Sequence, residues 1–280
     1  MDIKATDVKK LREITGAGMM DCKKALTEAG GDFKKAERIL KEMGLAAAAK
    51  RSGRATNEGR IFTLVSGSKA GLLEIACETD FVAMNKDFIT VGNEILSDVV
   101  EKELSELPDE LKEKVAGLVS KLKENMEIRR FTTTRSGENE LLVDYVHGEG
   151  RIGVIIKMGA ESPEALADEK VKEFAFNCAL HAAAFNPLYL SSDKVDPEYL
   201  KEQEEIFTKQ AESLGKPEKV VAGIVKGKLN KHLSEICFVD QKFVKDDKQS
   251  VSKVMEALGK EVGTKLSLTD YLYYRVGEEI

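Results

Sequence analysis

The sequence predicts an α+β fold: a three-helix N-terminal module, then a core of two small subdomains of antiparallel sheet and helix, with a helical hairpin inserted in the second. Three patterns indicate this class. Over residues 1–44 apolar residues recur every three or four positions, as on amphipathic helices. From Gly59 short apolar runs predict strands. Over about residues 196–236 the apolar spacing is that of two coiled-coil helices around a short turn.

The apolar spacing over residues 1–44 predicts three short helices that pack together as one module. Short polar residues are expected to begin these helices and glycines to end them. The expected caps are Thr6 and Asp32, and the expected stops are Gly16, Gly30 and Gly44. The second helix carries the apolar residues Met19, Met20 and Cys22. Residues 45–58 are rich in alanine and then basic, which predicts a helical tail that fades into a linker.

Residues 59–158 are expected to form the first core subdomain. Residues 60–65 and 71–76 predict a β-hairpin around a tight turn at Gly67. One helix is expected from Phe81 to about Glu103. The remaining expected elements are a helix over about 109–124 and strands at 128–131, 141–146 and 151–157. We expect the strands of this span to share one small sheet backed by the helices.

Residues 159–280 are expected to form the second core subdomain, which opens with a helix begun by Pro163. The hairpin starts at Asp196-Pro197, a cap residue followed by proline in the first turn. Its expected seam consists of Leu200, Phe207, Leu214, Ala222, Val225, Leu229, His232 and Ile236. A helix over 251–258 and a strand over 265–276 complete the prediction.

The composition is that of a folded protein with few special features. Of the 280 residues 42% are apolar and 33% charged, and the formal net charge of −6 argues against a nucleic-acid binder. No apolar run approaches the roughly 20 residues that cross a bilayer, and the N-terminus lacks a secretory segment. The four cysteines lie too far apart for a disulfide framework or a Cys-x-x-Cys metal site. We expect a reduced, cytoplasmic protein without a cofactor, membrane contact or nucleic-acid partner.

Residues 74–83 lie where a strand pattern changes to a helix pattern. Thr79 or Asp80 is suited to cap the helix, because a short side-chain oxygen can accept from free backbone amides. Phe81 then lies at the strand–helix corner, where its ring either folds into the core or points outward. For an isolated phenylalanine on a helix the core is the commoner outcome.

Two motifs resemble the elongation factor Ts family, the guanine-nucleotide exchange factors of elongation factor Tu. Leu11–Leu26 is similar to the opening of that family, and Thr79–Ala83 is similar to its central signature. The resemblance implies a ubiquitin-associated-like N-terminal module that contacts the G domain of elongation factor Tu, with Cys22 and Lys23 at contact positions. It also implies an exposed Asp80-Phe81 corner that is pushed into the same domain.

Two further segments resemble contact regions of the family. Tyr145–Val154 resembles a motif whose histidine lies near the partner, and residues 241–246 resemble a segment that faces the distal domain of elongation factor Tu. The sequence departs from the family at Lys123, where glycine is common, and at Lys242, where proline is usual. The partner-binding residues implied are Cys22, Lys23, Thr79, Asp80, Phe81, Val82, His147, Gly148, Phe243 and Val244.

The expected function is therefore exchange by binding and not by chemistry. The sequence has no Gly-x-x-x-x-Gly-Lys-Ser/Thr loop, so we expect no direct binding of nucleotide. The resemblance implies that the Asp80-Phe81 corner enters next to the magnesium and phosphate site of elongation factor Tu and stabilises its nucleotide-free state.

Two other functions stay open from the sequence. The first is a non-catalytic adaptor that docks on the translation machinery through the N-terminal module. The second is a cysteine hydrolase that would use Cys77 or Cys178 with His147 or His181. For His181 itself a satisfied histidine in the core is the favoured interpretation.

Overall fold

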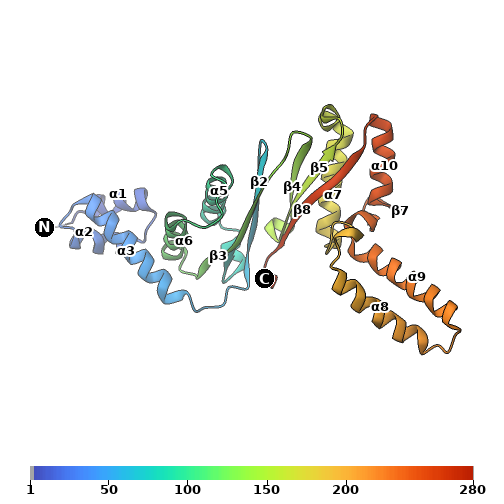
Figure 1. Ribbon diagram of the computed structural model, residues 1–280. Helices are drawn as coiled ribbons and strands as arrows, with labels where there is room; N and C mark the ends of the chain where they lie inside the picture. The colour runs from blue at the N-terminus through green and yellow to red at the C-terminus, as the bar shows by residue number, and fades with distance from the viewer. Residues whose placement is uncertain (1–2, 280) are drawn as a thin grey trace. The chain divides into compact units, whose positions relative to one another are not determined.

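The computed structural model describes residues 3–279 and confirms the α+β class (Figure 1). Residues 1, 2 and 280, which belong to the expected first and last modules, lie outside the described residues. The strands form three small sheets with the orders β1-β2-β3, β4-β5-β8 and β6-β7. The chain packs into two compact units. The first takes residues up to 134, 146–153 and those from 274 onward, and the second takes 135–145 and 154–273.

The N-terminal helices are α1 (Ala5–Thr15), α2 (Met19–Glu28) and α3 (Phe33–Arg51). They close around side chains with no exposed surface: Leu11, Cys22, Ala25, Leu26 and Ala36. Gly16 ends α1 with a φ of 66°. The predicted cap Asp32 accepts a hydrogen bond from the N–H of Lys35 at 3.1 Å.

Two predicted boundaries of these helices are wrong. Thr6 is not a cap, because α1 already begins at Ala5 and Lys4 occupies the N-cap position without a side-chain hydrogen bond. Gly44 does not end α3, which continues to Arg51 through the alanine run that follows. The glycine is buried where α3 packs on α6 (Asp109–Leu122), and a Cβ atom there would lie 3.6 Å from the carbonyl oxygen of Ala116, an ordinary contact distance.

The first sheet consists of β1 (Glu58–Ser66), β2 (Lys69–Cys77) and β3 (Met126–Arg135). The predicted hairpin is confirmed, since β1 and β2 pair antiparallel from Glu58↔Cys77 to Ser66↔Lys69. The single helix expected after Phe81 is two helices, α4 (Asp80–Ala83) and α5 (Lys86–Glu101). Asn85 separates them, because its side chain accepts from the N–H of Asp87 at 2.9 Å and starts α5 anew.

A buried carboxylate fastens the end of the described chain to the first sheet. Glu74 on β2 has no exposed surface, and it accepts from Arg129 at 3.3 Å, Arg130 at 2.7 Å and the N–H of Gly277 at 3.0 Å. Arg130 also donates to the carbonyl oxygen of Arg275 at 3.1 Å. Residues 274–279 are thus part of the first unit.

The strands expected at 141–146 and 151–157 do not join the first sheet. They form β4 (Glu140–His147) and β5 (Ile152–Ala160) of a separate sheet, in which β5 lies between β4 and β8 (Leu266–Arg275), the predicted C-terminal strand. The pattern of apolar residues marks a strand and its buried face, but it does not identify the neighbouring strand. The chain is therefore more interleaved than the linear division predicted from the sequence.

The helices of the second unit are α7 (Glu169–Phe185), α8 (Pro197–Glu212), α9 (Glu218–Ile236) and α10 (Val251–Val262). Strands β6 (Lys242–Phe243) and β7 (Asp246–Ser250) form a small hairpin before α10. Pro163 starts only a short 3₁₀ turn, η2 (Pro163–Ala167). The cap of α7 is Asp168, which accepts from the N–H of Lys170 at 2.8 Å.

The predicted helical hairpin is confirmed as α8 and α9, which pack against each other (Figure 1). Asp196 caps α8 by accepting from the N–H of Glu198 at 2.8 Å. The expected seam is partly wrong. Val221 is buried and Ala222 is exposed, while Leu214 is 55% exposed because α8 ends at Glu212, before it.

Candidate partner-binding site

The signature around Phe81 forms a sharp corner where β2 ends. Thr79 has an extended backbone with φ −130° and ψ 155°, and its hydroxyl oxygen accepts from the N–H of Val82 at 3.4 Å. Of the two predicted caps, Thr79 is therefore the one that the structure uses. Asp80 and Phe81 follow as the first two residues of the four-residue helix α4.

The ring of Phe81 points outward. It is 80% exposed, and its neighbours Asp80 and Met84 are exposed as well. Val82 and Ala83 are 8% and 7% exposed and belong to the core of the first unit. The corner thus uses Val82 and Ala83 as anchors and leaves an aromatic ring beside a carboxylate on the surface, where both are accessible to a partner.

Two carboxylates, Glu78 and Glu124, fix the backbone of the corner through hydrogen bonds. Glu124 accepts from the N–H of Thr79 at 3.0 Å and from its hydroxyl at 2.7 Å. Glu78 accepts from the N–H of Asn125 at 2.6 Å and pairs with Arg54 at 3.3 Å. The Asn125 N–H and the Arg54 guanidinium hold the pKa of the Glu78 carboxyl below its ordinary value.

Sequence reasoning missed Glu78 and Glu124 as functional candidates, because their partners are 47 and 45 positions away in the chain. The available signal was Lys123. It has a φ of 66°, ends α6 in the left-handed conformation that favours glycine, and turns the chain into Glu124. Lys123 also forms an ion pair with Asp21 at 3.3 Å.

On the N-terminal module, the two predicted contact residues have opposite environments. Lys23 is exposed, whereas Cys22 has no exposed surface and its thiol donates to the carbonyl oxygen of Ala17 at 3.7 Å. A direct contact between the Cys22 side chain and a partner is therefore not supported by its position. The sequence also missed exposed apolar side chains on this module, which are Ile14 at 59%, Met19 at 54% and Met20 at 74%.

His147 and Gly148 lie at the end of β4, and both are exposed. The backbone that follows has a positive φ at three successive residues, Gly148, Glu149 and Gly150. Arg60 stabilises this turn by donating to the carbonyl oxygen of Glu149 at 2.6 Å. A side chain at position 150 would collide with Arg60, because a Cβ atom there would lie 2.4 Å from its Cγ.

The predicted distal contact divides into a buried and an exposed residue. Phe243 is 5% exposed, and its ring lies 5.5 Å from that of Phe174 and 6.1 Å from that of His181, between centroids. The expectation that the Phe243 ring contacts a partner is thus not supported by its position. Val244 is 36% exposed and can make that contact.

His181 is a core histidine, as favoured from the sequence, and it also fixes the segment that carries Val244. Its Nδ1 accepts from the N–H of Val244 at 3.2 Å, so the neutral ring carries its proton on Nε2 and donates to Gln241 Oε1 at 2.9 Å. Burial lowers the pKa of His181. No pattern in the sequence indicates this positioning role.

The chemistry of the thiols opposes the cysteine-hydrolase alternative. Burial raises the pKa of Cys77 to about 12, and the thiol donates to the carbonyl oxygen of Thr79 at 3.1 Å. Burial also raises the pKa of Cys178. A nucleophilic cysteine needs a lowered pKa, since the thiolate is the reactive form.

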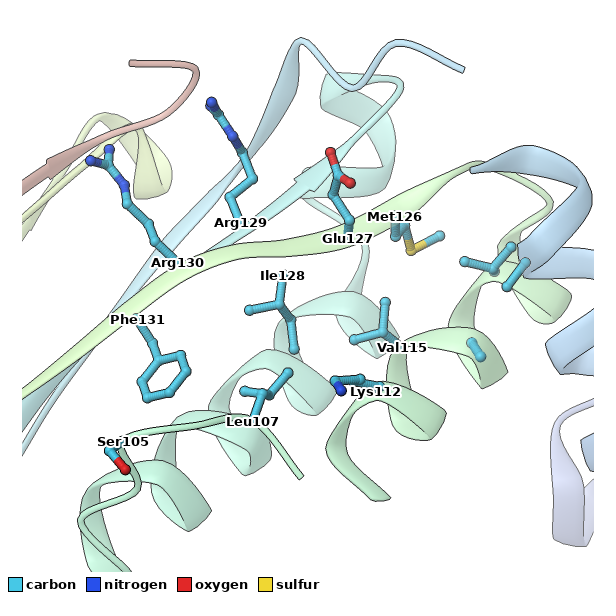
Figure 2. Close-up of a pocket in the computed structure, with 13 residues that line it drawn as sticks. Ser105, Leu107, Lys112, Val115, Met126, Glu127, Ile128, Arg129, Arg130 and Phe131 are labelled. Carbon is cyan, nitrogen blue, oxygen red and sulfur yellow. The ribbon is translucent and has the colours of Figure 1, made fainter. Parts of the chain in front are cut away.

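A groove of about 580 Å³ lies between α6 and β3 (Figure 2). Leu107, Val115, Ile128 and Phe131 give it an apolar lining, whereas Glu127 and Arg129 lie on the other side of β3 (Figure 2). None of the predicted site residues lines this groove. We therefore place the candidate site at the exposed corner and not here.

Three observations concern membranes, metals and known proteins. Within residues 3–279, no helix is both long and apolar enough to cross a lipid bilayer. In the same described part, no group of three or more His, Cys, Asp and Glu side chains is placed to hold a metal ion. The family model described as elongation factor TS matches residues 78–278, which include the Asp80-Phe81 corner, the carboxylates Glu78 and Glu124 that hold it, and His181.

Proteins named elongation factor Ts are similar to this chain over nearly its whole length. The protein from Treponema denticola is 52% identical over 277 residues, covering 99% of both chains. The Borrelia hermsii protein is 47% identical over 278 residues, covering 99% of this chain and 100% of its own. The Borreliella burgdorferi protein is 45% identical over 276 residues, covering 98% and 99%. This chain belongs to the elongation factor Ts family.

Proposed function

We propose that this protein is the guanine-nucleotide exchange factor of elongation factor Tu: it binds that partner, promotes release of GDP and so allows exchange for GTP. Membership of the family supports the partner and the reaction. The observation that carries the proposal is the Phe81 ring, 80% exposed on a corner whose backbone is held by Thr79 and Glu124.

The proposed mechanism places the corner in the G domain of elongation factor Tu. The Phe81 ring enters an apolar slot, and the Asp80 carboxylate comes next to the magnesium and phosphate site. A carboxylate there repels the phosphates and competes for the cation, so bound nucleotide is destabilised. No covalent bond forms or breaks in the protein, which acts only by stabilising the nucleotide-free partner.

The magnitudes require contacts beyond Phe81. Burying one phenylalanine is worth about 1.5–3 kcal/mol, whereas a nucleotide bound with nanomolar affinity is held by about 12 kcal/mol. In the proposal, Lys23 with the exposed Met19 and Met20 adds contact to the G domain, as does the turn at His147 and Gly148. Val244 faces the distal domain.

Linkage makes the effect reciprocal. If the exchange factor lowers the affinity of elongation factor Tu for GDP, then GDP must lower the affinity of elongation factor Tu for the exchange factor by the same ratio. The complex with empty elongation factor Tu is therefore tight and the complex with loaded elongation factor Tu is weak, which allows the factor to dissociate after exchange.

A non-catalytic adaptor is the second candidate function. The exposed apolar residues Ile14, Met19 and Met20 would also suit a docking module that binds the translation machinery without affecting nucleotide. The two candidates differ in one measurable quantity, which is the rate at which elongation factor Tu releases GDP.

The test is release of fluorescent GDP from elongation factor Tu, followed by stopped flow. We expect the wild-type protein to accelerate release and Phe81→Ala to be roughly 10- to 100-fold less effective at low concentration, which is the rate equivalent of burying the ring. Phe176→Ala is the matched control, since Phe176 is a 41% exposed phenylalanine in the second unit. Binding without acceleration by the wild type would favour the adaptor.

A further inference from the structure

We propose that Glu124 is a positioning residue for exchange: its carboxylate orders the Asp80-Phe81 corner before the partner arrives. The inference rests on the proposed function for its kinetic part, and it also makes a claim about the free protein. The role of Glu124 follows from where its two carboxylate oxygens lie.

The corner needs an external support, because α4 is too short to hold itself. Its four residues make a single turn, and a single helical turn is not stable alone. The Phe81 ring is 80% exposed and gains little packing from its own fold. The direction of the ring therefore depends on the anchors Val82 and Ala83 and on how Thr79 is fixed.

Glu124 fixes Thr79 at both of its donors. Oε2 accepts from the backbone N–H at 3.0 Å, and Oε1 accepts from the hydroxyl at 2.7 Å. Because the hydroxyl proton points to Glu124, the hydroxyl lone pairs are free to accept from the N–H of Val82 at 3.4 Å. Glu124 thus orients the cap of α4, and the cap orients the turn that carries Phe81. Hydrogen bonds to a carboxylate are stronger than those between neutral groups.

A second carboxylate links the same two segments, but here the acceptor belongs to the corner and the donor to the segment after α6. Glu78, the residue before Thr79, accepts from the N–H of Asn125, the residue after Glu124, at 2.6 Å. Asn125 in turn donates from its side chain to the carbonyl oxygen of Arg54 at 2.8 Å. Two adjacent residues of the corner are therefore cross-linked to two adjacent residues after α6, which limits both translation and twist of the corner.

Such an ordered corner affects the rate of productive docking. A flexible segment must lose conformational freedom on binding, and pre-ordering removes that cost. Loss of Glu124 should therefore raise the concentration of factor needed for half-maximal exchange, while the maximal rate at saturation changes less than about twofold, since the residues that enter the G domain are unaltered.

The kinetic test is a double-mutant cycle with Glu124→Ala and Phe81→Ala, measured by release of fluorescent GDP from elongation factor Tu. We expect Glu124→Ala to lower the second-order rate constant by about tenfold, equivalent to about 1.4 kcal/mol. Glu124→Gln, which keeps one acceptor oxygen, should have an intermediate effect. In the Phe81→Ala background, Glu124→Ala should have a clearly smaller effect than in the wild type, because only Asp80 is left to position.

Glu127→Ala is the matched control. It removes the same charge three residues further on, and this exposed side chain only accepts from the hydroxyl of Thr56 at 2.8 Å. We expect exchange by Glu127→Ala to be within about twofold of the wild type. Thermal unfolding of every variant shows whether the fold persists, and Glu124→Gln remains informative if Glu124→Ala does not fold.

A measurement on the free protein separates this inference from the proposed function. We expect Glu124→Ala, and to a smaller extent Glu124→Gln, to speed amide hydrogen exchange at Val82 and Ala83, with little change in the strand pairs of β1 and β2. Unchanged exchange at these two amides in both variants would overturn the inference. So would a Glu124→Ala protein as active as the wild type, or a cycle in which the two effects simply add. If the wild type itself failed to accelerate GDP release, the proposed function would fall, and the amide exchange would still decide whether Glu124 orders the corner.

Discussion

At the scale of single residues, the corner shows how one exposed ring depends on buried partners. Phe81 itself makes few contacts, and the residues that hold it are Thr79, Glu124 and the pair Val82 and Ala83. The motif match over Thr79–Ala83 marks Thr79, Phe81, Val82 and Ala83 alike and does not include Glu124. It does not say which side chain faces a partner and which faces the core.

Cys22 and Phe243 illustrate this limit. Both lie in segments that resemble contact regions, and both side chains are buried in their own unit. The exposed residues beside them, Lys23 and Val244, are those that can reach a partner. The motif match could not separate the two, because a short motif includes residues from both faces of a helix or strand.

Lys123 gives a prediction about stability at this scale. Its left-handed backbone, with φ 66°, is costly for a residue with a Cβ atom and not for glycine. We expect Lys123→Gly to raise the free energy of unfolding by about 0.5–1 kcal/mol relative to Lys123→Ala. Both variants lose the ion pair with Asp21, so the comparison isolates the backbone. Urea unfolding measures it, and a glycine variant less stable than the alanine variant would contradict the prediction.

His181 gives a prediction about pH. Burial lowers the pKa of His181 in the folded protein below the value of about 6.5 in an unfolded chain. As pH falls, the unfolded chain therefore takes up this proton first, and folding is progressively disfavoured. The stability contributed by neutral His181 is complete above about pH 6.5 and declines below it.

The consequence can be measured with a variant that does not titrate. We expect the wild type to lose stability to urea between about pH 7 and 5 more steeply than His181→Gln, because only the wild type must keep an imidazole uncharged between Val244 and Gln241. Equal pH slopes for the two proteins would show that His181 does not contribute.

At the scale of elements, the sequence predicted most helices and strands but not all of their ends and partners. The hairpin β1–β2 and the pair α8–α9 are local, so their spacing and turns specify them. The pairing of β5 with β8 joins distant parts of the chain, and no local pattern records it. The extra length of α3 follows from the alanine run after Gly44, whose helix propensity outweighs the single glycine that was expected to end the helix.

The seam of α8 and α9 provides a matched pair of substitutions. Val221 is 8% exposed and belongs to the cluster with Ala211 and Val225, whereas the next residue, Ala222, is exposed. We expect Val221→Asp to destabilise the pairing by more than about 2 kcal/mol, because it buries a charge and removes apolar contact. Ala222→Asp should change it by less than about 0.5 kcal/mol. Amide hydrogen exchange along α8 and α9 measures both, and equal effects would place the seam elsewhere.

At the scale of the whole molecule, each of the two compact units carries a different set of the proposed partner contacts. The first unit contains the corner, the exposed residues of the N-terminal module and the turn at His147, which are the proposed contacts to the G domain. The second contains Val244 and the His181 network, the proposed contact to the distal domain. Composition and charge restricted the class of partner, but the surface that each unit presents depends on burial and could be read only from the fold.

The buried Glu74 has a consequence for how the protein is made. Glu74 on β2 and Arg130 on β3 are translated long before their backbone partners near the end of the described chain. Gly277 follows Glu74 by 203 positions, and Arg275 follows Arg130 by 145 positions. A nascent chain leaving the ribosome can form the β1–β2 hairpin early, but it cannot finish the first unit until synthesis has passed through all of the second. Completion of the unit that carries Phe81 is in this way delayed until residues 275–277 have emerged.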